Sequence, residues 1–337
     1  MNNNLHIITA DTVREILDQY PLELYEIIKN SYILHDQQGS INAPSSFLFF
    51  PHRPESRIIA LPAAIKPNQE KFNEISGIKW IASYPNNKLK HMPRASAIII
   101  LNHPDTGFPM VCMEGSLISA TRTALSGIVG AEYLYNKDKS CKSLGLVGNG
   151  FIAKHIVKYL FLLGWKIENI HLYDKFSSSV EDFRQYIQSF GDLKITIHDS
   201  VSTLIESCSL IAFTTTEKIP YLNDHNLFKH KPCILHISLR DISPDIILDS
   251  INVVDDSEHI LAANTSVHLA YERNKKDASF ITATIGQVVQ QKQTIPKNKT
   301  IVYSPMGLGI LDLSVSQFVY DKVKKQDLKN IENFFPS

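Results

Sequence analysis

Three charged residues stand where their neighbours in the sequence are apolar or small. Lys79 lies within ISGIKWIAS, Arg122 lies within SATRTALSG, and Asp241 closely follows the apolar stretch CILHISL. A lysine and an arginine together suit a carboxylate ligand, because the guanidinium offers a bidentate fork beside the point charge of the ammonium. An aspartate just past a strand suits general acid–base chemistry. The sequence therefore predicts a carboxylate-binding pair and an acid–base group.

Each of these residues could instead be an ordinary exposed charge. Lys79 could project from the polar face of a strand, and Asp241 could cap a turn. Arg122 could be a solvated helix position or a surface partner of Glu114. The sequence alone leaves both interpretations open.

A further candidate site is the stretch SLGLVGNGFIAKH, which fits the pattern G-x-G-x-x-G/A from Gly148 to Ala153. Gly148 permits a tight turn, Gly150 lets a pyrophosphate approach the backbone, and the small third residue lets a helix pack closely on the strand. The helix that begins there would present free N–H groups to the phosphates. A strand before the loop and the strand-like NIHLYD after the helix give the motif the context of dinucleotide binding.

Asp174 ends the segment NIHLYD, 26 residues after Gly148. An acidic residue at this place accepts hydrogen bonds from the adenosine ribose hydroxyls and repels a 2′-phosphate, which favours NAD over NADP. Lys175 complicates this preference, because its charge could partly offset the repulsion. The alternative is a plain strand–turn–helix in which Asp174 caps the helix.

The candidate residues are positioned by helices and strands. The first third of the chain mixes helical and strand-like segments. Helical spacing covers DTVREILDQY and LELYEIIKNSYILHD, with Asp11 as the candidate N-cap of the first. RIIALPAAI, ISGIKWIAS and ASAIIILN are predicted strands, and HPDTG a turn after the last of them. A long helix, EGSLISATRTALSGIVGAEYL, carries Arg122.

From Ser143 onward, strand-like and helical segments alternate. The strand-like segments are SLGLVG, NIHLYD, KITIH, LIAFTTT, CILHISL and INVVDD, and the helical ones are FIAKHIVKYLFLL, VEDFRQYIQSF and VSTLIES. This alternation of apolar strands and helices predicts a parallel sheet covered on both faces. The final LGILDLSVSQFVYDKVKK is again helical.

The predicted fold class is therefore α/β, with a Rossmann-type doubly wound dinucleotide-binding domain inserted into a discontinuous α+β domain. The first domain would comprise residues 1–130 plus 305–337, and the inserted NAD-binding domain residues 131–304. Such an insertion explains why the glycine loop lies so late in the chain.

Composition narrows the classes of function. Lys+Arg and Asp+Glu number 34 each, so the zero net charge gives no electrostatic case for nucleic acid or an anionic membrane as partner. The longest apolar runs are too short to cross a bilayer, and the N-terminus does not read as a secretory signal. The four cysteines have no zinc-ligand or redox spacing, so we expect no metal and a reduced, cytoplasmic protein.

The chain resembles the ornithine cyclodeaminase/mu-crystallin family of NAD(P)-dependent proteins. The resemblance rests on GIKWIAS, RASAIIILNHPDTGFPM, SATRTALSG, GLVGNGFIAKH, ISLRD and SPMGLGILDLS, which span about residues 57 to 316 in the family's order. It implies a homodimer formed through the first domain, and a small amino-acid-derived substrate whose carboxylate Lys79 and Arg122 bind. It also implies that Asp241 manages the proton and the attacking water. The implied NAD contacts are Thr123, Gly148, Asn149, Gly150, Phe151, Ile152, Asp174 and, as weaker candidates, Thr214 and Thr215.

Within the family, ISGIKWI, MEGSLISATRTA and SPMGLGILDLS look most like the branch that makes 2,3-diaminopropionate for siderophores and peptide antibiotics. That resemblance implies oxidation of N-(2-amino-2-carboxyethyl)-L-glutamate with NAD and water to 2-oxoglutarate and L-2,3-diaminopropionate. One alternative is ornithine cyclodeamination or reduction of a cyclic imino acid on the same scaffold. The other, from a different class, is an NAD(P)H-binding protein without catalytic function, as mu-crystallin-like members can be.

The sequence departs from the family pattern at two places. Family members often carry a carboxylate-binding arginine shortly after the proline that corresponds to Pro44, where this chain reads APSSFLFFPHRP. Arg53 or Arg57 is the candidate replacement, and Arg57 is taken as the substrate-binding one. The family also often has a glutamate where this chain has Thr284.

Overall fold

The computed structural model describes residues 4–262 and 264–336, and the chain forms two compact units. The first unit combines Met1–Arg122 with Leu308–Ser337, and the second is Thr123–Gly307. The chain enters the second unit partway along helix α3 (Ser116–Gly130) and leaves it just before helix α11 (Gly309–Lys322). The predicted boundaries, at 130/131 and 304/305, lie inside the second unit, because a sequence pattern marks where elements end and not where packing changes partners.

The first unit is built on one sheet with the strand order β16-β1-β7-β6-β5-β4-β2, in which β3 also pairs with β4. Neighbouring strands are antiparallel except for β1 and β7, which are parallel. The strands are β1 (Leu5–Ile8), β2 (Ser40–Asn42), β3 (Ser46–Phe50), β4 (Arg53–Ile65), β5 (Ile75–Ser83), β6 (Ala95–Asn102), β7 (Pro109–Glu114) and β16 (Lys329–Ile331). The helices are α1 (Ala10–Gln19), α2 (Pro21–Asp36) and α11, with 3₁₀ turns at Pro85–Lys90 and Lys325–Asp327.

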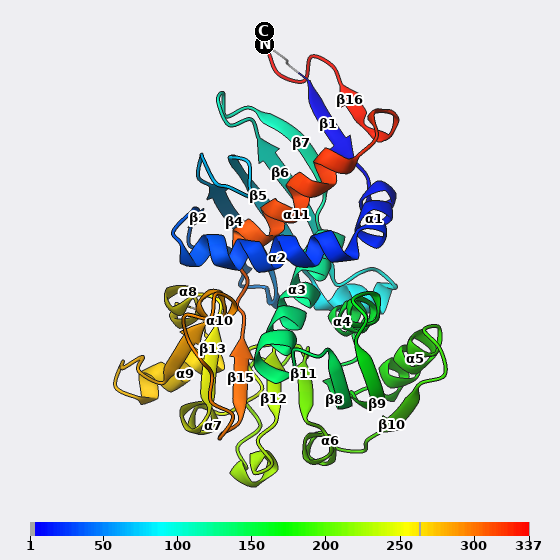
Figure 1. The fold of residues 1–337 in the computed structure, drawn as a ribbon. Coiled ribbons are helices and arrows are strands. Elements are labelled where there is room, and N and C mark those ends of the chain that lie inside the picture. The colour runs from blue at the N-terminus through cyan, green and yellow to red at the C-terminus, as the bar shows by residue number, and fades with distance from the viewer. Residues whose placement is uncertain (1–3, 263, 337) are drawn as a thin grey trace. The chain divides into compact units, whose positions relative to one another are not determined.

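Along each strand of this sheet, every second side chain points to the face that the helices cover. Ile99 and Leu101 of β6 and Met113 of β7 are buried, whereas Ile98, which precedes Ile99 on β6, is 42% exposed. Helix α11 packs against β4, β5, β6 and α2, and Figure 1 shows α2 and α11 crossing the same face of the sheet. Side chains at odd positions of β5 therefore face α11.

The second unit contains a wholly parallel sheet with the strand order β10-β9-β8-β11-β12-β15-β13-β14 (Figure 1). The strands are β8 (Ser140–Val147), β9 (Lys166–Tyr173), β10 (Lys194–Ile197), β11 (Leu210–Phe213), β12 (Cys233–His236), β13 (Ile251–Val254), β14 (Ile281–Thr284) and β15 (Ile301–Ser304). The helices are α4 (Phe151–Leu162), α5 (Ser177–Gln188), α6 (Val201–Ser207), α7 (Pro244–Asp249), α8 (Ser257–Leu261), α9 (Ser266–Arg273) and α10 (Ile285–Val289). A π-helical turn (Ala131–Tyr135) follows α3, and a 3₁₀ turn spans His225–Phe228.

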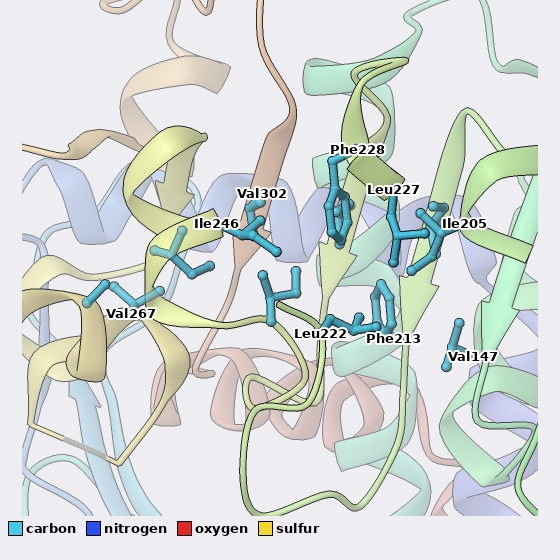
Figure 2. Packing of buried hydrophobic residues seen from close by; sticks show 14 of the residues in the cluster. Val147, Ile205, Phe213, Leu222, Leu227, Phe228, Ile246, Val267 and Val302 are labelled. Carbon is cyan, nitrogen blue, oxygen red and sulfur yellow. The ribbon is translucent and has the colours of Figure 1, made fainter. Parts of the chain in front are cut away.

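The core of the second unit includes a cluster of large apolar side chains from β11, β12 and the helices that follow them. Phe213, Phe228 and Ile246 are among its buried members, and Figure 2 shows them packed side by side with Val302 of β15. β11, β12 and β13 are each buried at all four positions. Burial on both faces explains why these strands read as continuous apolar runs in the sequence.

The strand order reverses direction between β8 and β11. From β8 the chain adds β9 and β10 on one side, and it then returns to add β11 and β12 on the other. Because parallel crossovers share one hand, the two series of helices fall on opposite faces of the sheet, and a crevice forms where they part. The doubly wound fold class predicted from the sequence is confirmed, and the carboxyl ends of β8 and β11 form its switch point.

Most predicted elements lie where the sequence placed them. ISGIKWIAS is strand β5, ASAIIILN is strand β6, and the predicted turn at HPDTG joins β6 to β7. The predicted cap of the first helix is wrong: α1 begins at Ala10, so its N-cap is Thr9, two residues before Asp11, and Asp11 pairs with Arg14 within the first turn. No helix in the described part of the chain combines the length and hydropathy needed to cross a bilayer.

Candidate active site

Lys79 is buried in the first unit. It lies in the middle of β5 on the face that α11 covers, and its side chain is 2% exposed. Its Nζ donates hydrogen bonds to Asp312 Oδ2 at 2.7 Å and to Ser119 Oγ at 3.2 Å. The interpretation of Lys79 as an exposed charge is therefore wrong, because packing beneath a helix removes its ammonium from water and leaves it dependent on these partners.

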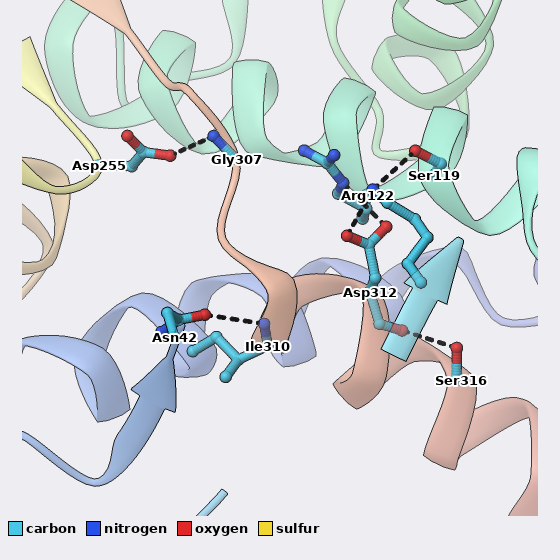
Figure 3. Close-up of polar contacts among 9 residues, drawn as sticks. Asn42, Ser119, Arg122, Asp255, Gly307, Ile310, Asp312 and Ser316 are labelled. Atoms are coloured by element: carbon cyan, nitrogen blue, oxygen red, sulfur yellow. Dashed lines mark hydrogen bonds and ion pairs between the residues drawn. The ribbon is translucent and has the colours of Figure 1, made fainter. Parts of the chain in front are cut away.

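Asp312, in the first turn of α11, joins Lys79 to the second predicted cation. Arg122 on α3 donates from Nε to Asp312 Oδ1 at 3.1 Å, and Figure 3 shows Arg122 and Ser119 beside this carboxylate. The Asp312 side chain is fully buried and that of Arg122 is 11% exposed. The alternative pairing of Arg122 with Glu114 is wrong, because the Glu114 carboxylate accepts backbone hydrogen bonds at the start of α3.

The cluster of Lys79, Asp312 and Arg122 holds two cations and one anion. Burial lowers the pKa of Lys79 to about 8, and the charge of Arg122 acts in the same direction while Asp312 opposes both. At neutral pH the cluster therefore keeps a formal net charge of plus one. Within residues 4–262 and 264–336, the terminal amino groups of Arg122 have no hydrogen-bond partner. A buried excess of positive charge with free donors favours an anionic ligand such as a carboxylate.

The sequence interpretation missed Asp312. Its segment, LGILDLS, predicts a helix and belongs to a motif of the family resemblance, but neither observation identifies Asp312 as a site residue. The signal that could have revealed it is the one that selected Lys79, namely a charged residue among apolar neighbours. Nothing in the sequence, however, pairs Asp312 with a residue of β5.

Arg57, the candidate replacement for the family arginine, lies on β4 toward one end of the same sheet. It pairs across the ladder with Ser83, whereas Lys79 pairs with Leu61. Arg57 is partly buried. No contact among the described residues joins it to the cluster around Asp312.

In the second unit, the glycine loop follows β8 at the switch point of the sheet. Gly148 has φ of +88°, and a Cβ at this residue would lie 2.9 Å from the carbonyl carbon of Thr214. Glycine is therefore required there by the protein itself. At Gly150, by contrast, a Cβ would meet no atom within 4 Å. The open space beside Gly150 fits the approach of a phosphate group, which is the role expected of the second glycine in the motif.

Two polar side chains support the loop from inside the unit. Thr214, at the end of β11, donates from Oγ1 to the carbonyl oxygen of Gly148 at 2.6 Å. Asn149 is buried and donates from Nδ2 to the Leu146 carbonyl oxygen at 3.2 Å, while its Oδ1 has no partner among the described residues. The predicted residues Thr214 and Asn149 thus lie against the loop, and Asn149 retains an acceptor for a ligand.

Asp174 follows β9 and holds the same loop from the other side. Its Oδ2 accepts a hydrogen bond from the Asn149 backbone N–H at 2.7 Å, and its Oδ1 accepts one from Phe176 N at 3.0 Å. The alternative of Asp174 as a helix cap is wrong, because the N-caps of α4 and α5 are Gly150 and Phe176 and neither helix has a side-chain cap hydrogen bond. Each carboxylate oxygen of Asp174 still has a second lone pair. Lys175 is paired with Glu217 at 2.7 Å on the surface, so it is less able to attract a 2′-phosphate.

Asp241 is fully buried past the end of β12, where hydroxyl groups surround its carboxylate. Thr215 donates from Oγ1 to Asp241 Oδ1 at 2.6 Å, and Ser238 donates from Oγ to Oδ2. The backbone N–H of Asp241 donates to His236 Nε2 at 3.1 Å, and this ring nitrogen lies 3.4 Å from Oδ2. Asp241 is therefore no exposed turn cap, and the predicted Thr215 is one of its direct partners.

Opposing effects set the acidity of Asp241. Burial raises its pKa, but the neighbouring His236 and the hydroxyls of Ser238 and Thr215 outweigh that effect, so its pKa is lowered. The carboxylate form is thus favoured at neutral pH. Burial and the neighbouring Asp241 charge raise the pKa of Tyr221, which keeps its hydroxyl protonated. These contacts hold Asp241 as an ionised carboxylate whose orientation is fixed by several donors.

The remaining predicted cofactor-binding residues are Thr123, Phe151 and Ile152. Thr123 is the first residue of the second unit, and Phe151 and Ile152 open α4 after the glycine loop. Their roles toward a cofactor stay predictions. Thr284, which replaces the family glutamate, caps α10 through a reciprocal pair of hydrogen bonds with Gln287. No group of three or more histidine, cysteine, aspartate or glutamate side chains in the described residues could hold a metal ion.

Comparisons with known proteins show the family and the fold to which this chain is similar. Residues 13–327 match the ornithine cyclodeaminase/mu-crystallin family. N-((2S)-2-amino-2-carboxyethyl)-L-glutamate dehydrogenase of Staphylococcus aureus is 28% identical over 286 residues, which cover 83% of this chain and 82% of the relative.

Two solved structures share the fold over almost the whole chain. Δ1-pyrroline-2-carboxylate reductase of Thermococcus litoralis, in complex with NADH and L-proline, has a TM-score of 0.83 at 20% identity and covers 94% of this chain and 97% of its own. A dimeric archaeal alanine dehydrogenase with bound NAD has a TM-score of 0.84 at 22% identity and covers 98% and 100%. At this level of identity the likeness concerns the fold.

Proposed function

Because the chain belongs to the ornithine cyclodeaminase/mu-crystallin family, we propose that it is an NAD-dependent oxidoreductase acting on the CH–NH group of an amino acid derivative. Its substrate is N-(2-amino-2-carboxyethyl)-L-glutamate, the compound in the name of the S. aureus relative. The observation that carries this proposal is the buried cluster of Lys79, Asp312 and Arg122, whose net positive charge fits a substrate carboxylate.

The proposed reaction consumes the substrate, NAD and one water and releases 2-oxoglutarate, L-2,3-diaminopropionate, NADH and a proton. When bound, NAD accepts a hydride from the Cα of the glutamate moiety. The C–N bond of that moiety becomes a C=N bond, water adds to its carbon, and the C–N bond then breaks. The glutamate moiety leaves as the 2-oxo acid, and nitrogen stays with the diaminopropionate.

The first unit binds and orients the substrate. The Lys79 ammonium and the terminal amino groups of Arg122 hold the carboxylate next to the reacting Cα, with Asp312 fixing both cations. A carboxylate held at two points cannot rotate freely, so the adjacent Cα–H keeps one direction. Positioning of this kind supplies a large share of the rate acceleration in two-reactant steps.

The second unit supplies the proton chemistry. Asp241, held as a carboxylate by Thr215 and Ser238, takes a proton from the water that adds to the C=N carbon and returns it to the departing nitrogen. A carboxylate with a lowered pKa is ionised at neutral pH, so Asp241 is in the form that accepts a proton.

The cofactor is bound by the glycine loop and the residues around it. Gly150 leaves room for the pyrophosphate, the N-terminus of α4 offers backbone N–H groups, and Asp174 faces the ribose hydroxyls. Phe151, Ile152, Thr123 and Thr214 line the remainder. Because Lys175 pairs with Glu217 on the surface, its charge does not offset that of Asp174, and the Asp174 carboxylate discriminates against the 2′-phosphate of NADP.

The enzyme is also proposed to be a homodimer formed through the first unit. Trp80 and Ile98 pair across β5 and β6, point away from α11 and are exposed, as is Leu48 of β3. An exposed apolar sheet face of this kind is typical of an interface. Sedimentation should give twice the mass of one chain, and Trp80→Glu should give one chain mass; a monomeric wild-type protein contradicts the proposal.

The decisive experiment mixes purified protein with NAD and N-(2-amino-2-carboxyethyl)-L-glutamate, with ornithine in a parallel cuvette and Asp241→Asn protein as the control. NADH accumulating together with 2-oxoglutarate and diaminopropionate, identified by mass spectrometry, supports the proposal. Proline and ammonia from ornithine without net NADH, or NADH consumed by a cyclic imino acid only, would replace it by the corresponding cyclodeaminase or reductase activity. Binding of NADH with no turnover of any of these compounds would favour a non-catalytic protein.

A further inference from the structure

Two arginines of the first unit reach the same serine at one end of the sheet. Arg57 on β4 lies directly across the ladder from Ser83 at the end of β5. Arg94, just before β6, donates from a terminal amino group to Ser83 Oγ at 2.7 Å. Both arginines are partly buried. Burial lowers the pKa of each, and the charge of Arg57 lowers the pKa of Arg94 further, so the two cations are close enough to repel.

Neither arginine has an acidic partner among the residues that the structure describes. The Nε of Arg57 is buried without any hydrogen-bond acceptor in that part of the chain. Glu55, the nearest carboxylate in the sequence, accepts a hydrogen bond from Asn86 instead. Two partly buried guanidinium groups that share no counter-ion are unfavourable in the protein alone. A bound anion would supply both the missing acceptor and the missing charge.

The pair lies on the same face of the sheet as the Lys79 cluster. Lys79 and Ser83 are both at odd positions of β5, and antiparallel partners share a face, so Arg57 points to that face too. Four residues of strand separate the Cα atoms of Lys79 and Ser83 by about 13 Å. Helix α3, which carries Arg122, begins at this end of the sheet, just after β7. Glu114, the last residue of β7, pairs with Ile98 of β6, and Ile98 pairs with Trp80, the neighbour of Lys79 on β5.

We propose that Arg57 and Arg94 form a second carboxylate site, which binds the distal carboxylate of a substrate whose first carboxylate is bound by Lys79 and Arg122. The chain then selects amino acid derivatives with at least two carboxylates and rejects monocarboxylates such as alanine or proline. This inference rests on the proposed function for the first carboxylate, and it assigns the second one to residues that the cluster around Asp312 does not contact. Guanidinium groups also bind phosphate, so phosphate is the competing ligand to be tested.

The test measures binding and does not require turnover. The NADH complex of the wild-type protein is titrated calorimetrically with 2-oxoglutarate, with 2-oxobutyrate, which lacks the distal carboxylate, and with inorganic phosphate. We expect 2-oxoglutarate to bind at least about ten-fold more tightly than 2-oxobutyrate, since one charge-assisted pair is lost. Equal affinity for the two oxo acids, or phosphate binding more tightly than 2-oxoglutarate, would overturn the inference.

Variants then assign the effect to the pair. Arg57→Gln and Arg94→Gln should each weaken 2-oxoglutarate binding about ten-fold or more while leaving 2-oxobutyrate unchanged. Arg14→Gln, which removes an exposed arginine of α1 in the same unit, is the control and should change neither. If either Gln variant melts early, Arg57→Lys or Arg94→Lys keeps the charge and should retain the preference for the diacid. Equal weakening of both oxo acids would mean a purely structural role and would contradict the inference.

This design separates the inference from the proposed function. A protein that prefers 2-oxoglutarate through Arg57 and Arg94, but does not oxidise N-(2-amino-2-carboxyethyl)-L-glutamate, keeps the second carboxylate site and loses the proposed reaction. A protein that oxidises this substrate with unchanged KM in both Gln variants keeps the reaction and loses the second site.

Discussion

Lys79 Nζ lies 2.7 Å from Asp312 Oδ2, although 233 residues separate them along the chain. The contact ties the middle of β5 to the first turn of α11, and it holds Arg122 through the other oxygen of the same carboxylate. One buried anion therefore fixes the directions of two cations. This arrangement makes Asp312 a positioning residue for the carboxylate-binding groups.

Replacement of Asp312 should destabilise the protein strongly. Asp312→Asn leaves two buried cations without a counter-charge, and the expected loss is about 3–5 kcal/mol of the free energy of unfolding. Urea unfolding at neutral pH measures it. Asp321→Asn, further along α11, is the control and should cost much less, because this carboxylate accepts an exposed hydrogen bond from Gln317 and is not part of the buried cluster. Equal losses for the two variants would show that the buried cluster has no special energetic role.

Carboxylate binding should weaken as the pH rises through the pKa of Lys79, which burial lowers to about 8. Below this value the cluster has a net charge of plus one, and above it Lys79 becomes neutral and the net charge falls to zero. The dissociation constant of 2-oxoglutarate for the NADH complex, followed across this range, measures the effect. Lys79→Arg keeps its charge and should move the loss to higher pH. An unchanged profile in that variant would assign the titration to another group.

Asp241→Asn should lower kcat by at least about a hundred-fold, as expected for loss of a general base, while NADH binds nearly as before. The amide keeps the shape of the side chain but cannot take a proton from water. Stopped-flow kinetics and NADH fluorescence titration separate the two effects. Asp245→Asn, which removes an exposed carboxylate paired with Arg273, is the control in the same unit. A near wild-type rate for Asp241→Asn would remove Asp241 from the mechanism.

The two glycines of the loop should respond differently to alanine. Gly148→Ala must adopt φ near +88° and push against Thr214, so it should lower stability by about 1 kcal/mol or more. Gly150→Ala meets no protein atom within 4 Å and should leave the melting temperature unchanged, while the added methyl group obstructs the pyrophosphate and raises the Kd of NAD. Unchanged NAD affinity in Gly150→Ala would place the pyrophosphate elsewhere.

Local patterns were enough to predict most of the elements. ISGIKWIAS and ASAIIILN are β-branched segments with clear ends, and they coincide with β5 and β6. The glycine loop needs only a strand, two glycines and a helix in succession, all of which are contiguous. The order of strand and helix segments after Ser143 likewise predicted the doubly wound class, because crossover handedness leaves few topologies.

Elements that depend on distant partners were missed. Strand β1 pairs with β16 from the opposite end of the chain, and β15 inserts between β12 and β13, although it follows both in sequence. β1, β15 and β16 have four, four and three residues, and none of them belongs to the alternation of strands and helices by which the equally short β10 to β13 were predicted. Their strand conformation comes from the hydrogen bonds of neighbours that the local sequence does not name.

The same distinction, between local sequence patterns and partners distant in the sequence, applies to the candidate site. Residue types and spacing alone selected Lys79, Arg122 and Asp241, because a charge among apolar neighbours is costly wherever it is buried. Only the packed fold decided that Lys79 faces α11 and not solvent, and that Asp312 pairs with both cations. The fold also brings Arg57 and Arg94 close together, with no acidic partner for either among the described residues. Side-chain partners arise from the register of strands and the placement of helices over a sheet, and these depend on the whole chain at once.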